Sequence, residues 1–206
     1  MNNRQHIFFD FGRTIVEHPE DGAGLRIVRE TGVTDEADAA RIRDVVFSAA
    51  KYANDLDDGS ITREQYKALL RGDLPERLHE YALAAADYHI SALPVLPGML
   101  ELLQKLKADG YKLYITSNLD EKHAGEMKDT VIAPYFDGML FSSHIRIRKP
   151  HTAFFETALS RFGVKAEECL FIDDLTDNVA AAEVCGIKSL LFRGDVAEAE
   201  RFIYEQ

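Results

Sequence analysis

Polar side chains that can hold a metal ion or a phosphate group follow several short apolar runs in this sequence. Asp10 directly follows residues 7–9, Ser117 closely follows residues 111–115, and Asp173 and Asp174 follow a late apolar run. One carboxylate in such a place is weak evidence, because Asp often caps the helix that comes next. Several of these groups in order along the chain are hard to explain by capping.

Together these groups predict a phosphoryl-transfer site. Asp10 and Asp174, from distant chain positions, can share Mg²⁺, a hard cation that prefers oxygen ligands and bridges to phosphate oxygens. Lys149, which precedes Pro150, and the Ser117 hydroxyl can neutralise and orient the equatorial phosphate oxygens. Asp10 can then attack phosphorus to give an aspartyl-phosphate, which water hydrolyses.

The elements that must position these residues alternate along the chain. The apolar runs predict buried strands, and helix-type periodicity separates them after residue 94. The predicted strands are residues 7–9, 111–115, 139–141, 169–172 and 189–192. This alternation predicts an α/β fold with a parallel sheet flanked by helices. Because ligands of such folds bind beyond the carboxyl ends of the strands, the polar groups are expected to meet at one edge of the sheet.

Residues 17–93 contain helical periodicity and no convincing strand, so they predict an all-helical insertion over the sheet. Thr62 and Gln65 form a capping-box pattern at the start of one helix, and Gly72 is expected to end it. The predicted domains are therefore a core of residues 1–16 and 94–206 and a helical cap of residues 17–93.

The overall composition limits the partners that the chain can have. It has 206 residues and a formal net charge of −11, which argues against non-specific binding to nucleic acid or to an anionic membrane. The first twelve residues contain no long apolar run, so we expect no secretory signal. No apolar run has membrane-spanning length, and Cys169 and Cys185 lack metal-type spacing. We therefore expect a cytoplasmic protein, a monomer or small homo-oligomer, acting on a small phosphorylated substrate.

Four segments of the chain resemble the motifs of the haloacid dehalogenase superfamily. They are residues 9–16, with Asp10 as the nucleophile; residues 115–118, with Ser117; residues 148–150, with Lys149; and residues 171–178, with an Asp-Asp-x-x-x-Asn pattern. The resemblance covers nearly the whole chain, and the four segments together are highly specific. The helical insertion is similar to the C1-type cap of this family.

The resemblance implies a Rossmann-like core, with a squiggle and flap after the first strand, and a role for each motif residue. Mg²⁺ would be held by the Asp10 carboxylate, the Gly12 carbonyl and Asp174, with Asp173 as a ligand or as a support for the ligands. Substrate phosphate would be bound by Gly12, Ser117, Asn118 and Lys149, and the catalytic residues would be Asp10, Ser117 and Lys149. Asn178 is a candidate for supporting the site, whereas Arg13 is expected to be structural.

Position 12 departs from the pattern of most phosphatases of the family, which carry a second Asp there as general acid and base. Gly12 can supply only its carbonyl, and general acid–base catalysis is worth roughly 10²–10⁴-fold in rate. Three explanations remain open. The substrate has a good leaving group, such as a sugar 1-phosphate or an acyl phosphate; another group, on the cap or at His18, supplies the proton; or the protein is slow or inactive. The Asp-x-Gly form resembles a branch that includes sugar 1-phosphate phosphatases, which favours the first.

The resulting prediction is a Mg²⁺-dependent phosphatase of a small phosphorylated metabolite, such as a sugar phosphate. The alternatives are a non-catalytic binding or regulatory protein, a phosphotransferase such as a sugar-phosphate mutase, and a 2-haloacid dehalogenase. The intact set of Asp10, Ser117, Lys149 and Asp174 argues against a pure binding role. The adjacent acids Asp173 and Asp174 argue against the metal-independent dehalogenase.

Overall fold

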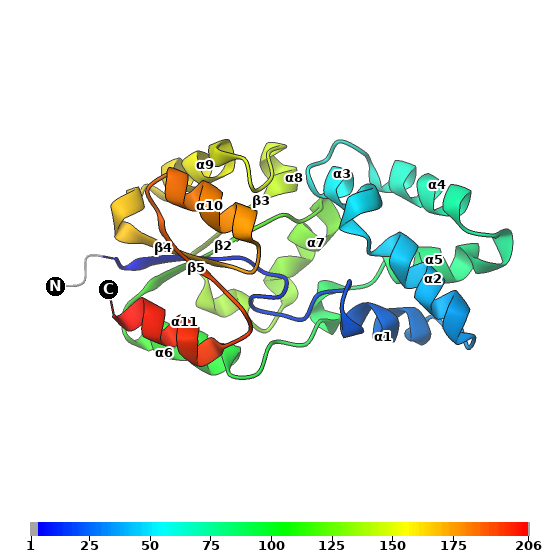
Figure 1. Ribbon diagram of the computed structural model, residues 1–206, viewed down its shortest axis with the longest axis horizontal. Coiled ribbons are helices and arrows are strands. Elements are labelled where there is room, and N and C mark those ends of the chain that lie inside the picture. The colour runs from blue at the N-terminus through cyan, green and yellow to red at the C-terminus, as the bar shows by residue number, and fades with distance from the viewer. Residues whose placement is uncertain (1–3, 206) are drawn as a thin grey trace.

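The computed structural model describes residues 4–205, and its centre is a parallel five-stranded sheet (Figure 1). The strands are β1 (His6–Phe9), β2 (Lys112–Ser117), β3 (Gly138–Phe141), β4 (Cys169–Asp173) and β5 (Lys188–Leu191). Their order is β3-β2-β1-β4-β5, and every neighbouring pair is parallel. The predicted α/β class and all five predicted strands are confirmed.

Helices cover both faces of the sheet (Figure 1). Ile7 and Phe9 of β1 belong to a core cluster that includes residues of α6 (Met99–Ala108) and α11 (Val196–Tyr204). Phe8, between them, packs in a second cluster with residues of α9 (Thr152–Phe162) and α10 (Thr176–Val184). Because side chains alternate across a strand, an apolar run is buried on both faces only when both are covered.

A group of helices between β1 and β2 lies beyond the carboxyl ends of the strands (Figure 1). They are α1 (Gly22–Glu30), α2 (Glu36–Val46), the π-helix η1 (Ala49–Ala53), α3 (Asn54–Asp57), α4 (Arg63–Asp73), the 3-10 turn η2 (Glu76–Leu78), α5 (His79–Ala86) and the 3-10 turn η3 (Ile90–Ala92). No strand occurs among residues 17–93, all of which the structure describes.

Helix α4 begins with the predicted capping box but ends later than predicted. Thr62 accepts a hydrogen bond from the Gln65 N–H, and the Gln65 side chain accepts one from the Thr62 N–H. The predicted end at Gly72 is wrong, because the helix continues through Asp73. Leu74 is extended and precedes Pro75, and a residue before proline is disfavoured in the helical region. The proline, rather than the glycine, ends the helix.

The remaining short elements connect the sheet to the insertion and to the outer helices. They are α7 (Glu121–Glu126), η4 (Met127–Asp129), η5 (Ala133–Tyr135), α8 (Ser142–Ile145) and η6 (Ala166–Glu168). Among residues 4–205, no helix has the length and apolar character needed to cross a membrane.

Candidate active site

Asp10 is the first residue after β1, and the sheet fixes its position. Its N–H donates a hydrogen bond to the Ile172 carbonyl of β4, at 2.9 Å. This bond continues the pairing of β1 with β4 one residue beyond the strand. The Asp10 carboxylate is buried at the carboxyl edge of the sheet, as its sequence position predicts.

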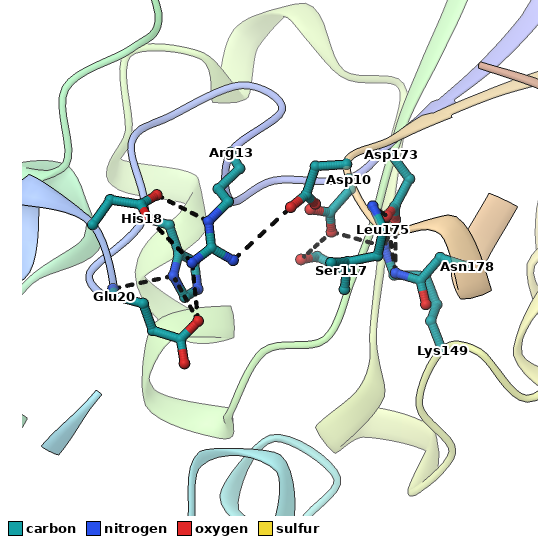
Figure 2. A network of polar contacts seen from close by, with 11 residues as sticks. Asp10, Arg13, His18, Glu20, Ser117, Lys149, Asp173, Leu175 and Asn178 are labelled. Carbon is teal, nitrogen blue, oxygen red and sulfur yellow. Dashed lines mark hydrogen bonds and ion pairs between the residues drawn. The ribbon is translucent and has the colours of Figure 1, made fainter. Parts of the chain in front are cut away.

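Two of the predicted site residues bind the same oxygen of Asp10 (Figure 2). The Ser117 hydroxyl, at the end of β2, donates to Asp10 Oδ1 at 2.9 Å. Lys149 Nζ donates to the same oxygen at 2.7 Å. The other carboxylate oxygen is left without either contact, so the carboxylate is oriented by both groups through one oxygen.

Lys149 lies between two carboxylates, although it is only 1 % exposed. Its ammonium group is 2.7 Å from Asp10 Oδ1 and 2.7 Å from Asp173 Oδ2. Burial by itself would lower the pKa of Lys149, but the charges of Asp10 and Asp173 outweigh it and hold this pKa above its ordinary value. Lys149 is therefore a fixed positive charge at the sheet edge.

Asn118 holds the backbone of Lys149 in place. Its side-chain amide donates to the Lys149 carbonyl at 3.0 Å and accepts from the Lys149 N–H at 2.9 Å. Asn118 was predicted to bind phosphate, and it does line the cavity above Asp10. Its two side-chain hydrogen bonds show that it also positions Lys149.

The adjacent residues Asp173 and Asp174 have different surroundings. Asp173 is fully buried and accepts hydrogen bonds from Lys149, from the Leu175 N–H and from the Asn178 side chain, which contacts both of its oxygens. This geometry favours the supporting role that the resemblance allowed for Asp173, and it places Asn178, a candidate for supporting the site, against Asp173. Asp173 does not line the cavity, whereas Asp174 does.

Asp174 carries a negative charge that is poorly compensated. Burial, followed by the charges of Asp10 and Asp173, raises the pKa of Asp174 to about 7. The nearest cation is Arg13, whose guanidinium is 3.9 Å from Asp174 Oδ2 and also binds Glu20 and Asp21. An additional cation near Asp10 and Asp174 would relieve this repulsion.

The donor set fits Mg²⁺ better than a metal that needs many protein ligands. Within residues 4–205 there is no group of three or more His, Cys, Asp or Glu side chains arranged to hold a metal ion. Asp10 and Asp174 supply two carboxylates, and Gly12 lies in the same cavity wall with a backbone carbonyl. Mg²⁺ is usually bound by one or two carboxylates, with water and substrate phosphate completing its shell.

The His18 ring occupies the space where a side chain at position 12 would begin. A Cβ atom placed on Gly12 would lie 2.7 Å from Cδ2 of the His18 ring, which is closer than a real Cβ contact. His18 Nδ1 accepts a hydrogen bond from the Glu20 N–H at 3.2 Å. Burial, followed by the charge of Arg13, lowers the pKa of His18 to about 4. A neutral His18 ring therefore lies beside Gly12, which has no side chain of its own.

Two adjoining cavities lie between the sheet edge and the helical insertion. The first, about 240 Å³, is lined by the predicted residues Asp10, Gly12, Ser117, Lys149 and Asp174. The second, about 100 Å³, has walls from the insertion that include Phe47, Leu56 and Tyr66. Residues of both cavities that no motif predicted include Asp57 and Tyr88. They belong to the insertion, where only helical periodicity was readable, so no sequence signal marked them.

The chain is similar in sequence to a family of hydrolases and to phosphatases of small metabolites. A family model described as haloacid dehalogenase-like hydrolase matches residues 7–192. A glyceraldehyde 3-phosphate phosphatase of Methanocaldococcus jannaschii is 36% identical over 94 residues, which are 44% of this chain and 41% of that protein. A ribulose-1,5-bisphosphate 5-phosphatase of Halopiger xanaduensis is 29% identical over 117 residues, which are 54% of this chain and 49% of that protein. The matched stretches thus span about half the length of these relatives or less.

Solved structures share the fold over nearly the whole chain. A HAD-like family hydrolase of Porphyromonas gingivalis has a TM-score of 0.70 at 21% identity, covering 98% of this chain and 99% of that one. A HAD family enzyme of Bacteroides thetaiotaomicron, solved as a magnesium complex, has a TM-score of 0.72 at 18% identity, covering 97% and 99%. At these identities the likeness establishes the fold.

Proposed function

Because the chain belongs to the haloacid dehalogenase-like hydrolase family, we propose that it is a Mg²⁺-dependent phosphatase of a small phosphorylated metabolite. The observation that carries this proposal is the placement of Asp10. Its carboxylate is held by Ser117 and Lys149 at the floor of a cavity that Asp174 also lines. The phosphatases named above are similar to this chain over part of their length and act on small phosphorylated compounds.

In the proposed reaction Asp10 is the nucleophile. An oxygen of its carboxylate forms a bond to phosphorus as the bond to the leaving oxygen breaks, and water then hydrolyses the aspartyl-phosphate. Lys149 and Ser117 bind equatorial phosphate oxygens, where negative charge must be stabilised. Asp173 and Asn178 keep Lys149 in position, and Asn118 holds its backbone.

Asp10, Asp174 and the Gly12 carbonyl would hold Mg²⁺, which supplies neutralisation of phosphate charge when bound. The helical insertion covers the cavity and chooses the leaving group. The two joined cavities favour a compact leaving group, in line with a small sugar phosphate or triose phosphate. A cytoplasmic location and a monomer or small homo-oligomer stay predictions from the sequence.

The test is phosphate release from a panel of monoesters, with and without Mg²⁺. The panel contains glyceraldehyde 3-phosphate, sugar 1-phosphates, sugar 6-phosphates and acetyl phosphate. Wild type is compared with Asp10→Asn and with Asp177→Asn, an exposed carboxylate in the first turn of α10. We expect release that requires Mg²⁺, falls to background in Asp10→Asn and is unchanged in Asp177→Asn.

Three other results of these assays would each identify a different function. A folded wild-type protein that binds Mg²⁺ and inorganic phosphate but releases phosphate from no ester would be a non-catalytic binding protein. Release of halide from a 2-haloacid without Mg²⁺ would identify a dehalogenase. Phosphate transfer between two sugar positions, in place of release, would identify a mutase.

A further inference from the structure

We infer that Asp57, in the helical insertion, is the acid–base group that Gly12 cannot supply; this inference rests on the proposed phosphatase function. Asp57 is the last residue of α3 and lines both the cavity above Asp10 and the adjoining one. It would donate a proton to the leaving oxygen and later accept one from the attacking water.

Asp57 lies where the phosphorus–oxygen bond to the leaving group would break. A phosphate group attacked by Asp10 lies in the first cavity, and the second cavity, which shares part of its lining, can receive the group attached to that phosphate. The residues shared by the two cavities mark the junction where the bridging oxygen would lie. They are His18, Pro19, Asp57, Tyr88, Asn118 and Leu119. Asp57 is the one carboxylic acid in this set.

Contacts with the core hold Asp57 at the junction. Its carbonyl accepts a hydrogen bond from the Ser142 hydroxyl at 2.6 Å, and the same hydroxyl accepts from the Leu119 N–H at 2.9 Å. The next residue, Asp58, lies 3.8 Å from the Arg148 guanidinium. A helix of the insertion is thereby tied to the loop after β2 and to the segment before Lys149, so Asp57 keeps its place relative to Asp10.

The surroundings of Asp57 favour a protonated acid in the unreacted site. Burial, followed by the negative charges of Asp120 and Asp58, raises the pKa of Asp57 well above its ordinary range. A hydrogen bond from the Asp120 N–H and the charge of Arg148 act in the opposite direction and are smaller in sum. The other titratable or charged side chains that line the two cavities are Asp10, Arg13, His18, Glu20, Arg63, Tyr66, Tyr88, His123, Lys149 and Asp174. A carboxylic acid kept protonated by its surroundings is suited to donate to a leaving group.

His18, the other titratable side chain at this junction, is a weaker candidate. Its Nδ1 already accepts the Glu20 N–H, and the ring atom nearest to the side-chain position of Gly12 is the carbon Cδ2. Its charged form is disfavoured by burial and by Arg13, so the ring has no readily lost proton near neutral pH. His18 therefore lines the site and is not assigned the proton transfer.

The proposed reaction has two steps, and it restores both carboxyl groups. First, the Asp10 oxygen bonds to phosphorus, the phosphorus–oxygen bond to the leaving group breaks, and the Asp57 proton moves to that oxygen to give an alcohol. Second, a water oxygen bonds to phosphorus, the bond to Asp10 breaks, and a water proton returns to Asp57. The products are the alcohol and inorganic phosphate, and both carboxyl groups are restored.

The experiment compares two leaving groups in wild type, Asp57→Asn and Asp55→Asn. An alkyl phosphate from the panel needs a proton on its leaving oxygen, whereas acetyl phosphate releases acetate and does not. We expect Asp57→Asn to lose about 10²–10⁴-fold in kcat/KM on the alkyl phosphate and only a few-fold on acetyl phosphate. The ratio kcat/KM reports the steps through release of the leaving group, and it leaves out the hydrolysis of the aspartyl-phosphate that both substrates share. Asp55→Asn makes the same change from carboxyl to amide in an exposed side chain of α3 that lines neither cavity, and should match wild type on both.

A pH profile gives a second readout that a structural role would not change. In wild type, kcat/KM on the alkyl phosphate should fall as the pH rises through the pKa of Asp57, because the acid form that donates to the leaving oxygen is lost. This alkaline limb should be missing in Asp57→Asn. Turnover of acetyl phosphate by the variant shows that it is folded and that Asp10 is still active. If Asp57→Asn fails to fold, the same two substrates are compared in Asp57→Ser, which leaves no amide at the junction.

Equal losses of kcat/KM on the two substrates, or no loss on either, would overturn the role of Asp57 as the acid. So would a selective loss on the alkyl phosphate in His18→Asn with Asp57→Asn unaffected. Failure of the proposed phosphatase function is a different result, because it appears as absent Mg²⁺-dependent release in the wild type itself.

Discussion

Lys149 and Asp173 form the rigid part of the candidate site. Lys149 is buried between Asp10 and Asp173, and Asp173 is in turn fixed by the Asn178 amide and the Leu175 N–H. A buried charge is tolerated only where partners compensate its loss of water. The lysine therefore stabilises two carboxylates at the same time as it presents positive charge to a phosphate group.

Replacing Lys149 by Met should reduce both stability and activity. The side chain keeps its approximate volume, but Asp10 and Asp173 lose their shared cation. Removal of one partner of a buried ion pair costs about 3–5 kcal/mol of unfolding free energy. Urea unfolding and phosphate release measure the two effects. Unfolding free energy equal to that of wild type would show that Lys149 does not stabilise these carboxylates.

At the scale of a single element, helix α1 holds in place the loop that precedes it. This loop carries His18 and Glu20, which line the cavity, and Arg13, which lines it too, binds Glu20. Gly24 lies in the first turns of α1, against the loop. A Cβ atom on Gly24 would lie 1.8 Å from the Pro19 carbonyl oxygen, so a side chain there has no room without a shift of backbone.

Gly24→Ala should therefore destabilise the protein, even though alanine is the better helix former by about 1 kcal/mol. Overpacking of this kind costs about 1–3 kcal/mol, and the shifted loop should also raise KM. Gly22→Ala, in the same helix, is the matched control, because its nearest contact would be Arg26 Nη1 at an ordinary 3.6 Å. Thermal unfolding of the two variants measures the difference in stability. Equal melting temperatures would contradict the close approach of Pro19 to Gly24.

At the scale of the whole molecule, the helical insertion is joined to the core by a buried ion-pair cluster. Arg63 of α4 contacts Asp120, which caps α7, at 2.7 Å, and His123 of α7 contacts the same carboxylate at 2.5 Å. Burial would raise the pKa of Asp120, but the hydrogen bond and charge of His123, followed by those of Arg63, hold it well below its ordinary value.

This cluster predicts loss of stability in acid. The folded-state pKa of Asp120 is below the unfolded value of 3.8, so its contribution is complete above that pH and is lost as the pH falls below it. Asp120→Asn should lower the free energy of unfolding at pH 7 by about 3–5 kcal/mol, because Arg63 loses a buried partner. It should also flatten the dependence of stability on pH below 3.8. Urea unfolding of both proteins across pH 2–7 measures this, and parallel curves would exclude Asp120 as the cause.

The sequence by itself determined the sheet and the chain positions of the motif residues. Apolar runs such as residues 7–9 form buried strands wherever both faces are covered, so the residues after them reach the same edge of a parallel sheet. Asp10 and Ser117 could therefore be placed together before any coordinates. These positions follow from local pattern and from the regular geometry of parallel strands.

Only the tertiary structure decided the partners of each side chain. Asp173 and Asp174 are chemically identical neighbours, yet one is turned to Lys149 and the other to the cavity, because successive side chains of an extended backbone point to opposite sides. Asp57 reaches the same cavity from the end of a short helix whose sequence carries no motif. Its place depends on how apolar helix faces and a few hydrogen bonds join distant segments, and no local pattern along the chain encodes that packing.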